Sequence, residues 1–241
     1  MAKVFIGVGH GGVDSGAVGN GLKEKALNLQ IALACRDFLT KHGVVVGMSR
    51  TTDENDALNE EIKECNAFAP DYAIDIHNNA GGGDGVEVYY HHGGGVGKTY
   101  AENILNEVVK IGQNSRGART KVNASGKDYY GFIRETNAPA NIIECAFIDN
   151  AKDITIIDTV AEQRAMGEAI AKGILKTLGI SYSESKSTND YAGSWAKNEI
   201  ERCIANKIMV GDGNGNFRPK DTVTREELAK VICNILDYIN K

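Results

Sequence analysis

The chain has 241 residues, which is enough for one large domain together with a small additional module. Its content of 42% apolar and 24% charged residues is that of an ordinary folded protein, so the composition indicates neither a disordered chain nor one embedded in a membrane. The formal net charge of −5, without a stripe of basic residues, argues against a general affinity for nucleic acid.

The predicted elements up to about residue 180 alternate between short β-rich runs and amphipathic helices. The expected strands are 4–8, 44–48, 72–77, 85–90 and 141–147. The expected helices, each with apolar residues repeating on one face, are 22–41, one around 101–108 and one at 160–178. This alternation predicts an α/β fold, in which helices flank a twisted, mostly parallel or mixed sheet.

A polar segment at 181–191 is expected to be a linker between a first domain, 1–180, and a small helical module, 192–241. The module begins with a helix at about 194–207, and a Gly/Asn-rich turn leads to a closing helix. Thr224 is expected to cap that closing helix, with Glu227 completing a capping box. About fifty residues give only a marginal core on their own, so docking or oligomerisation would help the module.

Five cysteines are scattered along the chain without a C-x-x-C pair, and their odd number argues against a disulfide framework or a thiolate zinc site. They are Cys35, Cys65, Cys145, Cys203 and Cys233. We therefore predict buried free thiols in a protein of a reducing compartment.

Two histidines and one glutamate stand where these elements could bring them together. His10 follows the first strand, His77 ends the third, and Glu24 begins the first helix. Strand ends in such a sheet deliver side chains into one crevice. Two imidazoles and one carboxylate commonly hold a catalytic Zn²⁺ with one position open for water, whose pKa then falls from about 15.7 towards about 7. The sequence therefore predicts metal-assisted hydrolysis.

Glu144 is the candidate general base. It lies inside the apolar run Ile142–Ala146, where a charge is costly unless the strand end opens onto a polar site or the charge is paired. Partial desolvation would raise its pKa towards the range that suits a general base. The alternative is a structural glutamate paired with an arginine such as Arg134.

The motifs that contain these residues follow one another in a fixed order. They are Gly9-His10-Gly11-Gly12, Glu24-Lys25-Ala26-Leu27-Asn28-Leu29, Ser49-Arg50-Thr51-Thr52-Asp53, Ile76-His77-Asn78-Asn79-Ala80, Arg134-Glu135-Thr136 and Glu144 with Phe147-Ile148-Asp149-Asn150. Over most of residues 1–180 this series closely resembles the zinc-dependent N-acetylmuramoyl-L-alanine amidases of the amidase-3 family. The resemblance implies that His10, Glu24 and His77 bind Zn²⁺. It also implies that Glu144 is catalytic.

The resemblance implies a substrate and a place of action. The reaction would be hydrolysis of the amide between N-acetylmuramic acid and L-alanine in peptidoglycan; an endolysin-like or autolysin-like role is expected from the N-terminus. The N-terminus runs from Met1 directly into a strand and shows no signal peptide, so we expect synthesis in the cytoplasm and action on the wall after release or membrane permeabilisation. No membrane insertion is expected. The alternative is a non-catalytic wall-binding protein that keeps the amidase fold.

Two positions depart from the pattern of that family. Val8 stands where relatives often have Pro, and Asp75 stands where they often have Ser. Asp75 should lie on the same side of its strand as His77, so it is either a partner for an imidazole or a residue that faces solvent or an arginine.

The module also has a likeness. Its motifs are Ser194-Trp195-Ala196, Ile200, Gly211-Asp212-Gly213, Phe217-Arg218-Pro219 and Thr224-Arg225-Glu226-Glu227. They resemble one S-layer homology repeat, a module that binds secondary cell-wall polymers in relatives and usually occurs in threes. To bind a wall polymer, a single copy would need either three chains to assemble or the copy to dock on the catalytic domain. Arg225 would contact the polymer; its alternative role is an exposed charge in the first helical turn.

Two glycine-rich stretches and a histidine pair admit other readings. Residues 7–12 match G-x-G-x-x-G, but the next helix begins too late to hold a pyrophosphate. The stretch 92–99 misses a phosphate-binding loop because His92 occupies the first glycine position. His91 and His92 follow a strand and either line the substrate cleft or are exposed loop residues.

Overall fold

The computed structural model describes residues 1–182, 190–211 and 217–239, and it divides into two compact units, Met1–Tyr182 and Ser183–Lys241. Most of the predicted linker 181–191 and the Gly/Asn-rich turn at 212–216 lie outside the described residues. Within the described ranges, no helix is both long enough and apolar enough to cross a membrane.

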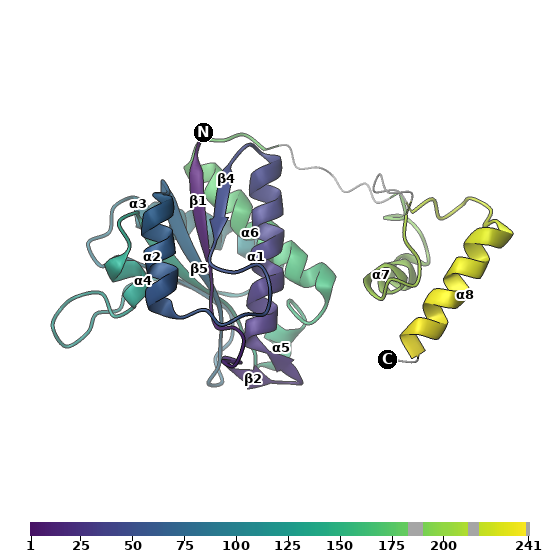
Figure 1. The fold of residues 1–241 in the computed structure, drawn as a ribbon, viewed down its shortest axis with the longest axis horizontal. Helices are drawn as coiled ribbons and strands as arrows, with labels where there is room; N and C mark the ends of the chain where they lie inside the picture. The colour runs from purple at the N-terminus through teal and green to yellow at the C-terminus, as the bar shows by residue number, and fades with distance from the viewer. Residues whose placement is uncertain (183–189, 212–216, 240–241) are drawn as a thin grey trace. The chain divides into compact units, whose positions relative to one another are not determined.

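The first unit is a six-stranded sheet with helices on both faces (Figure 1). Its strands are β1 (Lys3–Val8), β4 (Val45–Met48), β5 (Tyr72–Asn79), β6 (Val86–Tyr90), β7 (Ser115–Arg119) and β8 (Ala140–Phe147). Its helices are α1 (Glu24–Lys41), α2 (Leu58–Phe68), α3 (Val96–Lys110), α4 (Gly131–Glu135), α5 (Ala151–Ile154) and α6 (Val160–Thr177). A short hairpin of β2 (Val18–Gly19) and β3 (Leu22–Lys23) precedes α1.

The strand order is β4-β1-β5-β8-β6-β7, and every neighbouring pair is parallel except β6 with β8. The carboxyl ends of β1, β5 and β8 therefore share one edge of the sheet, whereas β6 and β7 run the opposite way. This mixed sheet flanked by helices confirms the predicted fold class.

Side chains alternate between two cores because successive strand residues face opposite sides of a sheet. Ile74 and Ile76 of β5 join the larger core, to which α1, α3 and α6 contribute. Ala73 of the same strand joins the smaller core with residues of α2 and α4. Ile74 and Ile76 are fully buried, and burial of each side chain contributes about 1.5–3 kcal/mol.

The five predicted strands are present with small shifts at their ends, and α1 begins at Glu24 because residues 22–23 form β3. We did not predict α2, although Leu58, Ile62 and Cys65 have helical spacing. We also missed β7, whose sequence Ser-Arg-Gly-Ala-Arg has no apolar run. Of the cysteines, Cys35, Cys65 and Cys145 are buried as predicted, while Cys203 is half-buried and Cys233 is exposed, so that prediction was wrong for these two.

The second unit contains α7 (Lys197–Ala205) and α8 (Arg225–Ile239) among its described residues. The predicted capping box is present: the Thr224 backbone N–H donates to Glu227, and the Glu227 N–H donates to the Thr224 hydroxyl. α7 is shorter than expected because it begins three residues after Ser194 and ends two residues before Lys207.

Candidate metal centre

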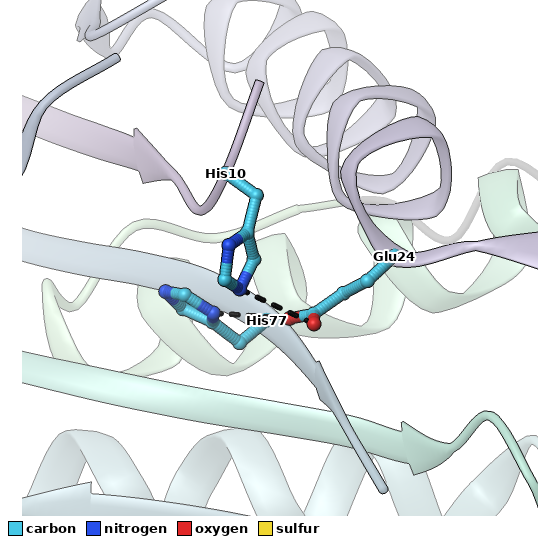
Figure 2. Close-up of side chains that lie close together, drawn as sticks. All are labelled: His10, Glu24 and His77. Atoms are coloured by element: carbon cyan, nitrogen blue, oxygen red, sulfur yellow. Dashed lines mark hydrogen bonds and ion pairs between the residues drawn. The ribbon is translucent and has the colours of Figure 1, made fainter. Parts of the chain in front are cut away.

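The structure brings together the three side chains that the sequence singles out, at the carboxyl edge of β1 and β5 (Figure 2). His10 lies just after β1, His77 lies in β5, and Glu24 is the first residue of α1. One donor atom from each side chain lies within 4.8 Å of the other two. Their role as metal ligands stays a prediction.

Glu24 lies between the two imidazoles. Its Oε2 is 3.2 Å from Nε2 of His10, and its Oε1 is 3.1 Å from Nδ1 of His77. The two rings meet edge to face, with centroids 5.1 Å apart. Both imidazoles therefore direct one nitrogen at the same carboxylate, as Figure 2 shows.

The remaining nitrogen of each imidazole faces a second carboxylate. Nδ1 of His10 is 2.8 Å from Asp14 Oδ2, and Nε2 of His77 is 3.0 Å from Asp75 Oδ2. In the neutral tautomer in which each ring N–H donates to its aspartate, the nitrogen that faces Glu24 is available as a ligand. The donor set and its orientation thus fit a divalent metal such as Zn²⁺. Asp75 is 2% exposed, which excludes the alternative that it faces solvent.

The pKa shifts of Glu24 and of the two histidines also favour a bound cation. Burial would raise the pKa of Glu24, but hydrogen bonds from His10 and His77 lower that pKa well below its ordinary value. The hydrogen bond to Glu24 raises the pKa of His10. Burial opposes protonation of His77, yet the charge of Asp75 and the bond to it raise the pKa of His77 well above its ordinary value. The pocket therefore favours positive charge between these groups, which a divalent cation would supply.

Backbone and amide groups fix Glu24 in place. The N–H groups of Ala17 and Asn78 donate to its two oxygens at 2.8 and 3.1 Å. Asn28, one helical turn further along α1, donates to Glu24 Oε1 and to the carbonyl of Gly9. We did not predict these roles of Asn28 and Asn78 from the sequence. Each is a polar residue at a position that the helix or strand pattern assigns to the core, and this could have indicated a role.

Position 9 requires a glycine because the backbone there passes close to the His77 ring. A Cβ added at Gly9 would lie 2.1 Å from the His77 ring, so any side chain there would displace the imidazole. His10 itself has a positive φ of 63°, a conformation that costs about 1–2 kcal/mol outside glycine. The paired backbone bonds between Gly11 and Asp14 stabilise this turn.

Arg50 joins the two segments that carry the site, and sequence reasoning missed this role. Its guanidinium, in a residue only 2% exposed, donates to backbone carbonyls of Val8, Gly9, Lys25 and Thr52. It therefore ties the loop of His10 to the first turn of α1. The sequence signal for this role was an arginine two residues after the end of β4.

Glu144 of β8 is the register neighbour of His77 in β5, so its side chain lies on the same face of the sheet. Burial raises the pKa of Glu144 to about 7, and the charges of Glu24 and Asp75 add to this while His77 opposes it. Its carboxylate has no hydrogen-bond partner in the described part of the chain. Arg134 instead donates to Glu135 and to loop carbonyls, so the alternative pairing with Glu144 was wrong.

Further acids lie behind the site. Glu61 of α2 is 4% exposed, and burial together with the charge of Asp75 raises its pKa well above its ordinary value. Asp56, Glu61 and Asp75 each keep one buried carboxylate oxygen without a hydrogen-bond partner among the described residues. This side of the sheet gathers more carboxyl groups than the two imidazoles can balance, and burial raises the pKa of Asp56 as well as that of Glu61, so protons offset part of the charge.

A second group of possible ligands lies elsewhere. His91 Nε2 and His92 Nδ1 are 3.0 and 2.7 Å from the same Oδ2 of Asp128. They follow β6, which runs antiparallel to β8, so they lie at the edge of the sheet opposite to His77, and of the two alternatives the structure agrees with exposed loop residues. The Gly93 N–H donates to His91 Nδ1, which leaves the proton on Nε2 facing Asp128. In this tautomer the His91–Asp128 contact is a hydrogen bond, so a metal ion could bind these three residues only by displacing that proton.

The second unit has a pocket between the segment before α8 and α8 itself. Among its lining residues are Phe217, Arg218, Glu227 and Lys230. Arg225 is exposed at the first position of α8 and is not one of them. Its predicted contact with a polymer stays a prediction.

Comparisons with known proteins agree with this geometry. The family model described as N-acetylmuramoyl-L-alanine amidase matches residues 4–176, and the S-layer homology domain model matches residues 187–229. The chain is 36% identical over 185 residues to N-acetylmuramoyl-L-alanine amidase CwlM of Bacillus licheniformis, which covers 75% of this chain and 70% of that protein.

Solved structures show the same fold in the first unit. Cwp6 from Clostridium difficile is 39% identical with a TM-score of 0.72, over 73% of this chain and 29% of that one. The catalytic domain of CwlV, an N-acetylmuramoyl-L-alanine amidase from Bacillus (Paenibacillus) polymyxa var. colistinus, is 29% identical with a TM-score of 0.68, over 75% of this chain and all of that one (100%).

The two histidine clusters predict different responses to substitution. We expect the purified chain to retain a single zinc ion after gel filtration and the His77→Ala variant to lose it, because one of three ligands is gone. The matched variant His91→Ala should keep the ion. Elemental analysis of the eluted protein measures this, and loss of the ion from His91→Ala but not from His77→Ala would contradict the assignment.

The two aspartates that bind the imidazoles should contribute unequally to the zinc affinity. Replacing Asp75 by Asn should weaken zinc affinity by about 10- to 100-fold, since a buried negative charge no longer supports His77. Asp14→Asn should weaken it by less than about tenfold, because the Asp14 side chain is 65% exposed and solvent screens its charge, compared with 3% for Asp75. Competition with a chromophoric chelator measures both affinities, and equal effects would contradict this order.

Proposed function

The chain belongs to the N-acetylmuramoyl-L-alanine amidase family, and from this membership we propose that it hydrolyses the amide between N-acetylmuramic acid and L-alanine in peptidoglycan with a bound Zn²⁺. The observation that supports the proposal is the convergence of the donor atoms of His10, Glu24 and His77 within 4.8 Å. Glu144 on the adjacent strand adds a group that can transfer protons.

Bound by His10, Glu24 and His77, Zn²⁺ would supply a Lewis acid that lowers the pKa of water and polarises the substrate carbonyl. The chain itself provides the proton transfer. Glu144 accepts a proton from the attacking water through a carboxylate oxygen and then delivers it to the departing nitrogen of L-alanine. A pKa of about 7 allows both steps near neutral pH, because the ionised and protonated forms are both well populated.

The neighbouring residues keep this geometry fixed. Asp14 and Asp75 hold the two imidazoles in one tautomer and one orientation, and the backbone N–H groups of Ala17 and Asn78 hold Glu24. Preorganised ligands of this kind do not have to reorient during the reaction, which lowers the barrier. The site therefore suits hydrolysis of an unactivated amide.

We further propose that the enzyme degrades bacterial walls in an endolysin-like or autolysin-like role, with the S-layer homology unit binding a secondary cell-wall polymer. Three basic residues support this second part. Arg225 is exposed at the start of α8, and Lys230 lines the pocket of this unit; Arg218 lines the pocket too but is paired there with Asp221 and Glu227. Such a polymer is commonly anionic, and cations at the pocket would attract it.

Glu144→Gln should lower the rate of wall hydrolysis by about 10²- to 10⁴-fold while zinc stays bound, because the variant keeps the ligands and loses the base. The wild-type rate should fall as the pH is lowered through the pKa of Glu144, since only the ionised carboxylate accepts a proton. Mass spectrometry of digested peptidoglycan should show stem peptides with a free N-terminal L-alanine.

Other results would decide against the proposal. New reducing ends would indicate a glycosidase. Release of wall fragments that persists in Glu144→Gln and in the presence of a chelator would exclude the mechanism. No release by the zinc-loaded wild type would favour the alternative, a non-catalytic wall-binding protein.

Wall binding can be separated from hydrolysis in the full-length Glu144→Gln protein. In that background Arg225→Ala should reduce cosedimentation with purified walls by about threefold or more, because it removes an exposed charge at the polymer site. Arg202→Ala on α7 is the matched control. If Arg218→Ala reduces binding and Arg225→Ala does not, the pocket and not the helix start holds the polymer.

A further inference from the structure

Residues at matching positions of neighbouring strands form a row across one face of the sheet. His77 of β5 pairs with Glu144 of β8, Glu144 pairs with Glu87 of β6, and Glu87 pairs with Gly117 of β7. Directly paired residues point to the same face. The row therefore leads from the metal centre, past Glu144, to the edge strand β7.

A β-bulge interrupts the pairing at the far end of this row. Val86 pairs with Ser115, but Glu87 pairs with Gly117, so Arg116 is an extra residue in β7. Bulges turn a side chain out of the regular alternation and often occur beside active sites. Gly117 has a φ of 94°, which a residue with a side chain rarely adopts. The bulge directs Arg116 towards Glu87.

Glu87 holds two arginines. Arg116 Nε lies 2.6 Å from Glu87 Oε1, and Arg119 NH1 lies 3.4 Å from the same oxygen. The Tyr89 hydroxyl donates to the other oxygen at 2.7 Å. The Glu87 side chain is 4% exposed, whereas those of Arg116 and Arg119 are 36% and 41% exposed. A buried carboxylate thus anchors two guanidinium groups that still reach solvent.

Both guanidinium groups keep donors to spare. The terminal amino groups of Arg116 and NH2 of Arg119 make no hydrogen bond to any residue in the described ranges. A Cβ added at Gly117 would meet nothing within 4 Å in the described part of the chain, so the space beside Gly117 is open. Glu87 is the only carboxylate that either guanidinium contacts in the described ranges, while Asp84 acts on Arg116 only at longer range, and planar guanidinium groups bind carboxylates through paired hydrogen bonds.

The spacing suits a peptide. Neighbouring strands are about 4.8 Å apart, so the open position at Gly117 is about 10 Å from Glu144. An extended peptide advances about 3.3–3.6 Å per residue, so this distance corresponds to two or three residues. The stem peptide of peptidoglycan carries carboxylates at that distance from its first residue.

We propose that Arg116 and Arg119 form a subsite that binds a carboxylate of the stem peptide two or three residues beyond the scissile bond. The inference rests on the proposed amidase function. The subsite explains why the edge strand β7, which has no apolar run, carries a bulge, and why its neighbour β6 carries a buried anchoring carboxylate. It also supplies positive charge that the acidic metal centre does not offer to a substrate anion.

The test uses the zinc-loaded full chain and N-acetylmuramoyl tripeptides in which the carboxylate of the second or third residue is replaced, one at a time, by a carboxamide. In the wild type, at least one replacement should lower kcat/KM by about tenfold, the effect of losing a charge-assisted hydrogen bond. The double variant Arg116→Gln/Arg119→Gln should cleave both forms equally well. Arg164→Gln, an exposed arginine of α6, is the matched control and should behave as the wild type.

In the double variant, Glu87 loses both arginine partners, and its buried charge could disturb folding. A second variant controls for this effect. Adding Glu87→Gln to the double variant removes the unpaired buried charge, and the triple variant should again lose the preference for the carboxylate. A wild type that cleaves both forms equally would overturn the subsite, as would variants that lose the same factor on both forms, because a structural defect does not distinguish between substrates.

Calorimetry separates failure of the subsite from failure of the proposed function. The same tripeptides are titrated into Glu144→Gln, where the carboxylate form should bind about tenfold more tightly than the carboxamide. Cleavage without any preference in rate or binding would leave the amidase proposal standing and remove the subsite. If the carboxylate form binds more tightly but the wild type cleaves neither form, the subsite stands and the amidase proposal fails.

Discussion

The placement of the Glu24 carboxylate between two imidazoles is the interaction on which the rest of the first unit depends. Its two oxygens face different histidines, so the side chain must be held from both sides. The β2–β3 hairpin places Ala17 against it, and β5 supplies the N–H of Asn78. Buried Arg50 then ties the His10 loop to the start of α1 through backbone carbonyls. The surrounding polar bonds serve to fix one carboxylate.

The register of the sheet extends this local order into a functional surface. A parallel sheet places paired residues on one face, so His77 and Glu144 meet although 67 positions separate them in the chain. The antiparallel pairing of β6 with β8 continues the line to Glu87. A glycine lies at each end of this row of residues, and the two have different roles. The missing side chain of Gly9 makes room for the His77 imidazole, whereas the space beside Gly117 stays open. A slip of one residue in β8 would turn Glu144 to the other face.

Most of the first unit could be predicted because its strands and long helices show their periodicity in the apolar residues. The convergence of His10, Glu24 and His77 could be predicted because two imidazoles and a carboxylate stand at element ends. What could not be predicted depends on pairing that periodicity does not encode. β7 has no apolar run, and its place follows from the bulge beside Glu87. Arg134 is bound by its own loop, and His91 lies at the opposite edge because β6 reverses direction.

The distribution of charge connects these observations. Asp14, Glu24, Asp75, Glu61 and Glu144 crowd the carboxyl edge of the sheet, and several buried oxygens there have no hydrogen-bond donor. Protons compensate in part, since the pKa values of both site histidines and of Glu61 are raised. Protons on the imidazoles and a metal ion compete for the same nitrogens, so metal binding must release them. The acidic surroundings would favour a divalent cation once those protons are released, and they would repel an anionic substrate that had no arginines to meet it.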